Sequence, residues 1–572
     1  MHPLLSIKNL SVDFIAESGV THALKNISIN VNRGEIVALV GESGSGKSVT
    51  SLSILQLLPS PPAKYSTGEI IFSENGNDAT DLLKRNRYEM QDIRGNKIAM
   101  IFQEPMTSLN PVLTCGDQVM EAILLHKQVS KENAKLQTIA WFEKVKLPDP
   151  ESIFKRYPHQ LSGGQKQRVM IAMAMSCEPS LLICDEPTTA LDVTVQKTIL
   201  QLIKELQQQS NIGVIFITHD LGVVAEVADR AVVMYKGEIV EQHTVKEIFT
   251  NPKHPYTQAL LACRPVNHER GKRLPVVSDF LQPADSIAQP LASISKSKNN
   301  SSSLRSSPEA LLTVENLSVW FPTKKTWLGK PVSFTKAVDN VSFEVYKSET
   351  LGLVGESGCG KTTLGRALLR LIEPTTGKIM YNNLDLTSKK RDELQNLRKD
   401  IQIIFQDPYS SLNPRLTIGS AIAEPMKVHH ILTNEKQRKE KVTELLEKVN
   451  LKAEHFSRYP HEFSGGQRQR IVIARALALN PSFIICDESV SALDVSVQAQ
   501  VLNLINDLKK EFGFTVIFIS HDLSVVRYIS DRIMVMNKGK IEETGLADEI
   551  YFNPQSAYTQ KLIESIPKGL IA

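Results

Sequence analysis

The chain has 572 residues, which is too long for one hydrophobic core and points to several domains or two large ones. Its 42% hydrophobic and 22% charged residues are typical of a soluble globular protein, and a net charge of +4 gives no overall attraction for nucleic acid. The six cysteines have no metal-ligand spacing, and no run of about eighteen apolar residues occurs. The sequence therefore predicts no zinc or iron–sulfur centre and no membrane-spanning helix.

The first strands of the chain lead into a phosphate-binding loop. Residues 7–14 are predicted to form an edge strand, with residues 23–31 as its hairpin partner. The apolar run 36–40 enters the sequence GESGSGKS of residues 41–48, and a helix is predicted over residues 49–58. A strand, GxxxxGK[ST] and a helix in this order form the context that such a loop requires.

Each residue type of this loop suits a bound nucleotide. Backbone N–H groups of the glycines can surround the β-phosphate, Lys47 can reach the β- and γ-phosphate oxygens, and Ser48 can offer its hydroxyl to Mg²⁺. The glycines of the loop are Gly41, Gly44 and Gly46. Upstream, Phe14 could be an ordinary core residue or could stack on a base, and the strand alone does not decide between the two.

Further candidate residues follow predicted strands or begin a helix. The strand 98–102 ends at Gln103, whose side chain can ligate Mg²⁺ and sense a γ-phosphate. Residues 112–160 have mainly helical periodicity. They lead to Ser162, Gly163, Gly164 and Gln165, where a serine and two glycines expose backbone N–H groups at a helix start, a favourable place for an anion.

The strand 181–184 ends at two carboxylates, Asp185 and Glu186, a pair suited to Mg²⁺ and an activated water. The strand 214–218 delivers His219 to the end of a parallel strand, where open α/β sheets bind ligands. Each feature also has an ordinary explanation: a solvent-facing Gln, a simple turn, a solvated strand end or a structural His. A single copy would not decide between these alternatives.

The second half of the chain repeats the whole series, which decides in favour of a functional site. Leu161 and Phe463 begin the two serine–glycine segments and lie 302 residues apart, and Asp185 and Asp487 have the same separation. The repeated residues are Phe321, Gly355, Gly358, Gly360, Lys361, Thr362, Gln406, Ser464, Gly465, Gly466, Gln467, Asp487, Glu488 and His521. We expect two α/β domains, residues 1–265 and 311–572, joined by a flexible Ser/Lys-rich linker over residues 266–310.

These motifs together resemble the nucleotide-binding subunits of ATP-binding cassette (ABC) transporters, over nearly the whole chain outside the linker. The finer resemblance is to the two ATPase subunits of oligopeptide/dipeptide importers, fused in one chain. It rests on the stretch RGNKIAMIFQEP of residues 94–105, the tail HPYTQALL of residues 254–261 and the stretch HEFSGGQRQR of residues 461–470. The family fold is a RecA-like phosphate-loop core with a parallel sheet, an antiparallel β subdomain and a helical subdomain that carries the signature.

The resemblance implies ATP and Mg²⁺ as cofactors and two composite sites, because in this family the cassettes pair head to tail. Glu186 and Glu488 would be general bases, and His219 and His521 would contact the γ-phosphate. Phe14 and Phe321 would stack on adenine. Each signature, residues 162–165 and 464–467, would complete the ATP site of the other half. The implied Mg²⁺ ligands are Ser48, Gln103 and Asp185 in the first half and Thr362, Gln406 and Asp487 in the second.

The resemblance also implies a place for the chain on the cytoplasmic face of the cell membrane. Its partners would be two integral membrane permease subunits, which we expect to be non-identical, and through them an extracytoplasmic solute-binding protein. A tandem-cassette ATPase of the ribosome would need a long charged helical linker, and a DNA-repair cassette would need zinc-ligand cysteines. An importer of nickel, glutathione or another small solute remains an alternative to a peptide importer.

Two departures from the family pattern stand out in this sequence. Members often carry a cysteine-rich extension after the tail that resembles residues 254–261, whereas residues 271–300 hold no cysteine, so we expect no cluster there. The second acidic strand end continues with Ser489 where proline is usual, which leaves Glu488 in place.

Overall fold

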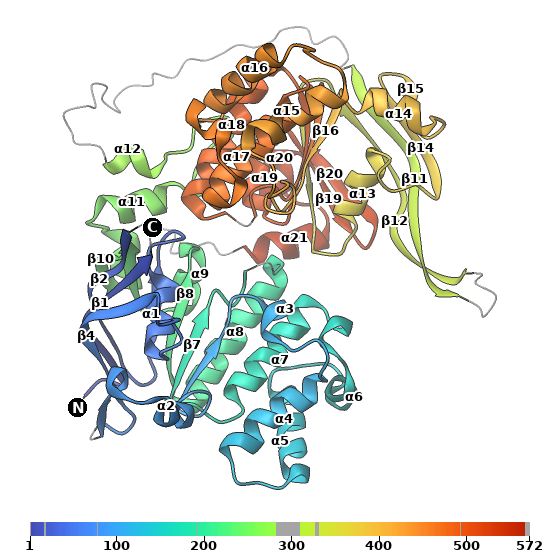
Figure 1. Ribbon diagram of the computed structural model, residues 1–572. Helices are drawn as coiled ribbons and strands as arrows, with labels where there is room; N and C mark the ends of the chain where they lie inside the picture. Colours follow the sequence, from blue (N-terminus) through green and yellow to red (C-terminus); the bar gives the residue numbers. More distant parts are fainter. Residues whose placement is uncertain are drawn as a thin grey trace. The chain divides into compact units, whose positions relative to one another are not determined.

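The computed structural model of the chain describes residues 2–16, 19–76, 78–189, 191–281, 309–325, 331–491 and 493–566 (Figure 1). These residues form two compact units, one ending at Leu261 and the other running from Ala262 to Ile566. No helix within the described residues is both long and apolar enough to cross a lipid bilayer.

The first unit begins with a hairpin and then alternates strands with helices. Its strands are β1 (Leu5–Ala16), β2 (Gly19–Val31), β3 (Ile36–Val40), β4 (Ala63–Ser73), β5 (Ala79–Asp81), β6 (Ile98–Ile101), β7 (Leu181–Asp185), β8 (Gly213–Thr218), β9 (Arg230–Tyr235) and β10 (Glu238–Thr244). Its helices are α1 (Lys47–Ile54), α2 (Arg87–Ile93), α3 (Pro105–Ser108), α4 (Cys115–His126), α5 (Lys131–Lys144), α6 (Pro150–Lys155), α7 (Gly163–Met175), α8 (Val193–Ser210), α9 (Leu221–Val227), α10 (Val245–Thr250) and α11 (Pro255–Ala262). Short 3₁₀ turns add η1 (Leu82–Lys84) and η2 (Pro158–Gln160).

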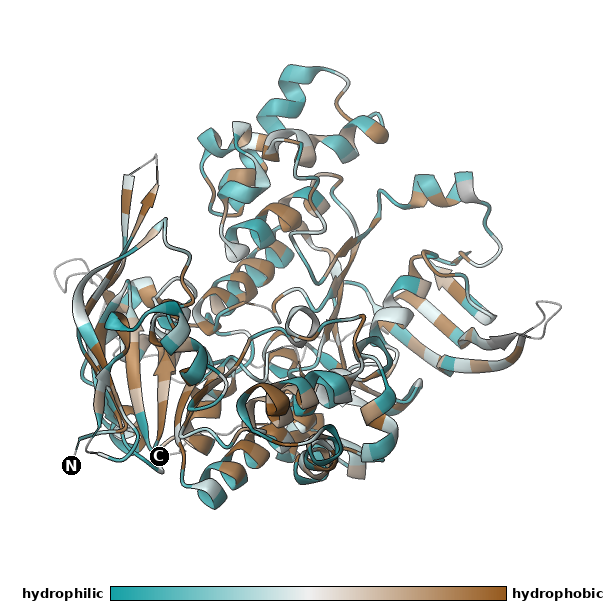
Figure 2. Ribbon diagram, turned by 60° about the horizontal axis from the view of Figure 1, so that its bottom comes forward, coloured by the Kyte–Doolittle hydropathy of each residue, from teal (hydrophilic) through white to brown (hydrophobic). Residues whose placement is uncertain are grey.

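Two sheets organise this unit. The larger has the strand order β10-β9-β3-β8-β7-β6, and its five strands from β9 to β6 run parallel to one another. Strands β3, β7 and β8 are buried along their whole length, which is why their sequences are continuous apolar runs. Figure 2 shows these central strands in the brown of hydrophobic residues. Parallel pairing sets their carboxyl ends, and the residues that follow them, along one edge of the sheet.

The smaller sheet is antiparallel and corrects one expectation. Its order is β2-β1-β4-β5, so β1 lies between two strands and is not an edge strand. The neighbour β4 is rich in Ser, Thr and Gly and lacks a strong apolar alternation, which hid it in the sequence. Beyond the sheets, helices α4 to α6 occupy the stretch that the periodicity of residues 112–160 predicts to be helical, and α7 follows them.

The second unit repeats this architecture. Its sheets have the orders β12-β11-β14-β15 and β16-β17-β18-β13-β19-β20. The strands are β11 (Ala310–Lys325), β12 (Pro331–Tyr346), β13 (Thr350–Val354), β14 (Thr376–Tyr381), β15 (Leu384–Asp385), β16 (Ile401–Ile404), β17 (Phe483–Asp487), β18 (Thr515–Ser520), β19 (Arg532–Asn537) and β20 (Lys540–Leu546). The helices are α12 (Val277–Leu281), α13 (Lys361–Leu368), α14 (Arg391–Leu397), α15 (Ile418–Val428), α16 (Glu435–Lys448), α17 (Gly465–Leu477), α18 (Val495–Phe512), α19 (Leu523–Ile529), α20 (Ala547–Phe552) and α21 (Ala557–Glu564), with 3₁₀ turns η3 (Pro265–Asn267), η5 (Ala453–Ser457) and η6 (Pro460–Glu462).

Residues 266–281 of the expected linker belong to the second unit in the structure, and together with residues 263–265 we call them the strap. The strap packs on the second unit, where Leu274 is fully buried and Val276 and Val277 are nearly so. The carboxamide of Asn503 in α18 pairs with the backbone of Leu274: its Oδ1 accepts from the N–H at 2.9 Å and its Nδ2 donates to the carbonyl at 2.8 Å. The strap lacks helical periodicity, so its few apolar residues gave no signal in the sequence. Residues 282–308 of the expected linker lie outside the described part of the chain.

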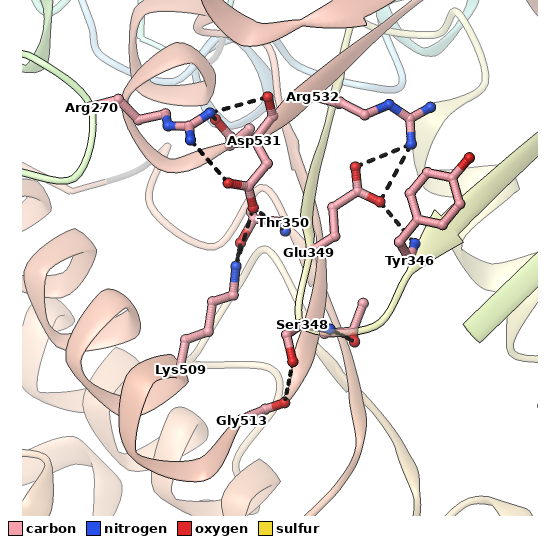
Figure 3. A network of polar contacts seen from close by, with 11 residues as sticks. Arg270, Tyr346, Ser348, Glu349, Thr350, Lys509, Gly513, Asp531 and Arg532 are labelled. Carbon is pink, nitrogen blue, oxygen red and sulfur yellow. Dashed lines mark hydrogen bonds and ion pairs between the residues drawn. The ribbon is translucent and has the colours of Figure 1, made fainter. Parts of the chain in front are cut away.

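Ionic contacts hold the beginning of the strap (Figure 3). The guanidinium of Arg270 lies 3.2 Å from Oδ1 of Asp531, and it also donates to the backbone carbonyl of that residue. Asp531 in turn accepts from the backbone N–H of Thr350 at 2.8 Å and lies 3.4 Å from Nζ of Lys509. Tyr528 adds a hydrogen bond of 2.7 Å from its hydroxyl to the carbonyl of Lys272. The strap is therefore an integral part of the second unit.

Candidate functional site

The two phosphate-binding loops have matching geometry. In the first, Nζ of Lys47 donates to the carbonyls of Gly41 at 2.7 Å and Glu42 at 2.9 Å. In the second, Lys361 donates to Gly355 at 2.8 Å and Glu356 at 2.9 Å. Both ammonium groups are thus held inside the loop at almost fully buried side chains, where a phosphate oxygen can replace the carbonyl partners.

The glycine that precedes each lysine is required by the backbone. Gly46 has φ 106° and Gly360 has φ 110°, values that disfavour any side chain. A Cβ at Gly360 would lie 2.0 Å from the carbonyl oxygen of Ala337, and one at Gly46 would lie 2.6 Å from Leu24. The local backbone therefore requires glycine at these two positions, and the binding of phosphate by the loop stays a prediction.

A hydroxyl and a carboxylate meet beside each loop. The hydroxyl of Ser48 donates to Oδ1 of Asp185 at 3.3 Å, and that of Thr362 donates to Oδ1 of Asp487 at 2.9 Å. Burial raises the pKa of both aspartates, partly opposed by these hydrogen bonds. Hard oxygen donors in this pairing are the ligand type that Mg²⁺ prefers, so the residues present fit the implied ion.

Three side chains converge on Glu186 at the end of β7. The amide Nε2 of Gln103 donates to its Oε2 at 3.0 Å, the hydroxyl of Thr189 donates to the same oxygen at 2.9 Å, and Nδ1 of His219 lies 3.4 Å from its Oε1. The backbone of Glu186 is left-handed, with φ 47°, and its N–H donates to the carbonyl of Ile217 on the neighbouring strand β8. A strained backbone at such a place is typical of functional sites.

The partners of Glu186 also set its charge. Burial alone would raise its pKa, but the hydrogen bonds and charge of His219, with Thr189 and Lys47 nearby, outweigh burial and lower the pKa to about 2. The carboxyl is therefore ionised at neutral pH. An ionised carboxylate that is nearly enclosed and fixed from both oxygens can accept a proton from water.

The second unit builds the same cluster around Glu488. Nε2 of Gln406 donates to its Oε2 at 2.7 Å, and Nδ1 of His521 lies 3.6 Å from its Oε1. Its φ is also 47°. Here Ser491 takes the place of Thr189 and donates to the backbone carbonyl of Glu488 instead of to the carboxylate. Burial alone would raise the pKa of the Glu488 carboxyl, but His521 and Lys361 outweigh burial and lower that pKa. Burial alone would lower the pKa of His521, but its contact with Glu488 outweighs burial and raises that pKa.

The two signature segments begin helices α7 and α17. Ser162 caps α7 by accepting from the N–H of Gln165, whose side chain bonds back to the N–H of Ser162 at 3.0 Å. Ser464 and Gln467 form the same capping box. In both segments the serine and first glycine are exposed, whereas the glutamine side chain is engaged in the cap. Gly164 and Gly466 are packing positions, because a Cβ would lie within 2.6 Å of Val195 or 2.3 Å of Val497.

The two predicted adenine-stacking residues occupy different surroundings. Phe14 is partly buried and packs against the hydrophobic core beneath the first antiparallel sheet. Phe321 is 41% exposed and pairs with Thr335 across the β11–β12 hairpin. Phe321 is therefore available to an aromatic ligand, while Phe14 offers only part of its ring.

The sequence analysis missed Thr189 and Tyr256. Thr189 holds the catalytic candidate Glu186, and the hydroxyl of Tyr256 accepts a hydrogen bond from the backbone N–H of Glu42 in the phosphate loop. The recurrence of Tyr-Thr-Gln at residues 256–258 and 558–560 was a signal that could have identified the tyrosine.

Comparison with known proteins shows which family the chain belongs to. The model of the ABC transporter family matches residues 24–189 and 338–491, and that of the oligopeptide/dipeptide transporter C-terminal region matches residues 240–283 and 543–569. The chain is 49% identical over 569 residues to the glutathione import ATP-binding protein GsiA of Escherichia coli K12, covering 99% of this chain and 89% of the relative. It is 48% identical over 565 residues to the protein of the same name in Pectobacterium atrosepticum, with the same coverage.

Among solved structures, a dimeric post-hydrolysis ATP-binding cassette bound to ADP and phosphate matches at 28% identity. The match has a TM-score of 0.38 and covers 41% of this chain and 98% of that structure.

The chain therefore belongs to the ABC transporter family. It is an ATP-hydrolysing protein with two cassettes in one polypeptide, and each unit has the α/β cassette fold.

Proposed function

We propose that the chain is the energy-coupling ATPase subunit of an importer for glutathione or a closely related short peptide. The observation that carries the ATPase part is the duplicated cluster of Gln, Glu and His beside each phosphate loop. The choice of solute is supported by 49% identity to a glutathione import ATP-binding protein along nearly the entire chain. Because ATPase subunits do not contact the transported solute, the solute is inferred from sequence similarity alone.

Each ATP would lie between the phosphate loop of one cassette and the signature of the other. The first site would combine Lys47, Ser48, Gln103, Asp185, Glu186 and His219 with residues 464–467. The second would combine Lys361, Thr362, Gln406, Asp487, Glu488 and His521 with residues 162–165. The exposed Gly163 and Gly465 at two capped helix starts support this pairing, since their N–H groups can bind an anion that another surface brings.

The chemistry of each site follows from the fixed carboxylate. Glu186 and Glu488 would accept a proton from the attacking water, and His219 and His521 would orient that carboxylate and contact the γ-phosphate. Lys47 and Lys361 would neutralise charge on the phosphate oxygens. Mg²⁺, held by Ser48 and Asp185 or by Thr362 and Asp487 with the Gln side chain, would supply charge neutralisation for the leaving phosphates.

The loops that follow Gln103 and Gln406 would transmit hydrolysis to the membrane partners. Each Gln is exposed after a strand and is hydrogen-bonded to the candidate base. Because few bonds separate this Gln from the γ-phosphate, loss of the phosphate can shift the loop. We propose that these loops dock on two permease subunits at the cytoplasmic face of the membrane. A solute-binding protein would act through the permease.

Uptake of labelled solutes tests the proposal. A strain from which the gene for this protein is deleted would be complemented with the wild-type protein or with the Glu186→Gln/Glu488→Gln variant. The uptake of glutathione, a dipeptide, a tetrapeptide and Ni²⁺ would then be measured. We expect uptake of glutathione with the wild type alone. Uptake of longer peptides or of Ni²⁺ in place of glutathione would overturn the proposed solute and leave the ATPase assignment intact.

A further inference from the structure

A tyrosine near the end of each cassette contacts its phosphate loop. The hydroxyl of Tyr256 in α11 accepts a hydrogen bond of 3.0 Å from the backbone N–H of Glu42. The hydroxyl of Tyr558 in α21 accepts one of 3.2 Å from the N–H of Glu356. Both tyrosines lie in the segments that match the oligopeptide/dipeptide transporter C-terminal region, about 200 residues after the loop they contact. The contact thus joins a C-terminal motif to the nucleotide site, and it occurs twice.

A carboxylate on the strand before each helix sets the position of the tyrosine; that of Glu241 is buried and that of Glu543 is half-buried. Glu241 in β10 accepts hydrogen bonds from the N–H groups of Lys253 at 2.9 Å and His254 at 3.0 Å, which fixes the residues that precede α11. In the second cassette Glu543 in β20 accepts from Gln555 at 2.8 Å and Ser556 at 3.1 Å. An ionised acceptor makes these hydrogen bonds strong ones. The strand therefore fixes the helix start, and the helix start fixes the tyrosine.

The contact acts on the part of the loop that the lysine also holds. Lys47 donates to the carbonyls of Gly41 and Glu42, and Tyr256 accepts from the N–H of Glu42. The peptide group between Gly41 and Glu42 is thus held at its carbonyl by the lysine and at its N–H by the tyrosine. When a phosphate takes Lys47 away from the carbonyls, the tyrosine contact remains and keeps this part of the loop in place.

We propose that Tyr256 and Tyr558 are positioning residues, which hold the phosphate loops ready for ATP. This inference rests on the proposed ATP sites and adds a residue outside the established cassette motifs to each of them. Each of these hydrogen bonds joins the tyrosine hydroxyl to a backbone N–H of the phosphate loop, so the expected effect is on the binding of phosphate and not on the proton transfer.

The surroundings of the two tyrosines predict that loss of the hydroxyl has different effects on nucleotide binding in the two cassettes. Tyr256 is fully buried, and its ring packs on Tyr235 with 4.3 Å between ring centroids. Tyr558 is partly exposed, and Asn537 occupies the position that corresponds to Tyr235. Water can replace the missing hydroxyl more easily at the second loop, so Tyr558→Phe should have the smaller effect.

The test compares two fluorescent nucleotides on the full chain in EDTA, where no turnover occurs. Trinitrophenyl-ATP reaches the phosphate loop, whereas trinitrophenyl-adenosine carries no phosphate. For Tyr256→Phe/Tyr558→Phe we expect the dissociation constant of the first to rise about two- to tenfold, the scale of one hydrogen bond, and that of the second to stay unchanged. In steady state KM for ATP should rise while kcat stays near the wild-type value.

Tyr381→Phe is the matched control, because Tyr381 is 2% exposed in the core of the second unit and packs near Phe483. It should leave both dissociation constants unchanged. Wild-type affinity of the double variant for trinitrophenyl-ATP, or equal losses for both nucleotides, would overturn the positioning role. Failure of the wild type itself to bind trinitrophenyl-ATP would instead overturn the proposed function.

Discussion

Gln103 bonds through Nε2 to Oε2 of Glu186 at 3.0 Å, so the residue that begins the loop after β6 is tied to the carboxylate that ends β7. Gln406 and Glu488 have the same relationship at 2.7 Å. One oxygen of each carboxylate thus accepts a hydrogen bond from the amide of the loop. If the carboxylate is the proposed base, a movement of the loop changes the hydrogen bonding of that base, which couples the proposed chemistry to the position of the loop.

Glu186→Gln and Glu488→Gln should each lower ATP turnover, and the double variant should lose a factor of about 10² or more. The amide keeps the shape of the carboxylate but cannot accept the proton of the water. ATPase rate at saturating ATP measures the effect. Glu178→Gln, at a side chain that is 66% exposed on the surface, serves as control and should retain the wild-type rate. Wild-type turnover in both single variants would remove these residues from the mechanism.

Pairs of substitutions, one in each cassette or both in the same cassette, can distinguish composite ATP sites from sites that a single cassette builds alone. Gly465→Glu should be accepted by its own helix, since a Cβ there meets no atom within 4 Å, yet its charge would repel a bound phosphate. In a Glu186→Gln/Glu488→Gln background, Lys47→Ala with Gly465→Glu should trap about one ATP per chain. Lys47→Ala with Gly163→Glu should trap none, because the two changes strike different sites.

Filtration with labelled ATP would count the nucleotide bound in each variant. The opposite pattern, with one ATP retained by the Gly163 combination, would mean that each cassette builds its own site.

The loops after Gln103 and Gln406 should not be interchangeable if they dock on two different permease subunits. They differ at exposed positions: Val112 is 75% exposed where the second loop has Arg415, and Tyr409 is 55% exposed where the first has Met106. Exchanging residues 104–112 with 407–415 should preserve basal ATPase activity, because no proposed ligand of the phosphates moves. Solute uptake should fall. Undiminished uptake would favour two equivalent membrane partners.

The strap should contribute to the stability of the second unit. Leu274→Ala removes a fully buried side chain and should lower the free energy of unfolding by about 2–5 kcal/mol. Asn503→Ala withdraws both partners of the Leu274 backbone and should cost about 1–3 kcal/mol. In a Trp141→Phe background, the two remaining tryptophans, 320 and 327, both lie in the second half of the chain. Their fluorescence then reports the unfolding of that half in urea.

Gln201 of α8 provides the control, since it is exposed and occupies the position in the first cassette that corresponds to Asn503. Gln201→Ala should leave the urea midpoint unchanged. If Leu274→Ala also left it unchanged, the packing of the strap would contribute nothing to the fold.

Glu241, which accepts hydrogen bonds from the two residues before α11, should make the stability of the first unit depend on pH. Burial alone would raise its pKa, but the hydrogen bonds that the carboxylate accepts outweigh burial and lower the pKa from its ordinary value of 4.5. The unfolded chain therefore takes up the proton first as the pH falls, so the stabilisation is complete above about pH 5 and lost as the pH drops through the folded-state pKa. Glu241→Gln should be less stable than the wild type at pH 7, with a difference that shrinks below about pH 4. A constant difference across this range would contradict the role of charge.

The sequence alone was sufficient to predict the candidate site residues that follow buried parallel strands. Asp185, Glu186 and His219 were predictable because the apolar runs β7 and β8 end just before them, and parallel pairing brings such ends together. The strand β4 could not be predicted from the sequence, because it is partly exposed and is interrupted by Gly68, whose φ is 101°. The contact of Tyr256 with the loop depends on the path of the chain over 200 residues, which no local pattern encodes.

The strap shows that the end of a segment matched by a family model need not coincide with the end of a folded unit. The family model of the C-terminal region continues to residue 283, whereas the first unit ends at Leu261. If the chain were expressed as two separate polypeptides divided within residues 282–308, the first product would carry a segment whose burial site belongs to the second. The second product would then present the vacated groove around Asn503 and Tyr528 to water. A division after Leu261 keeps the segment with the body it covers, so co-expressed halves made that way should be the more soluble pair.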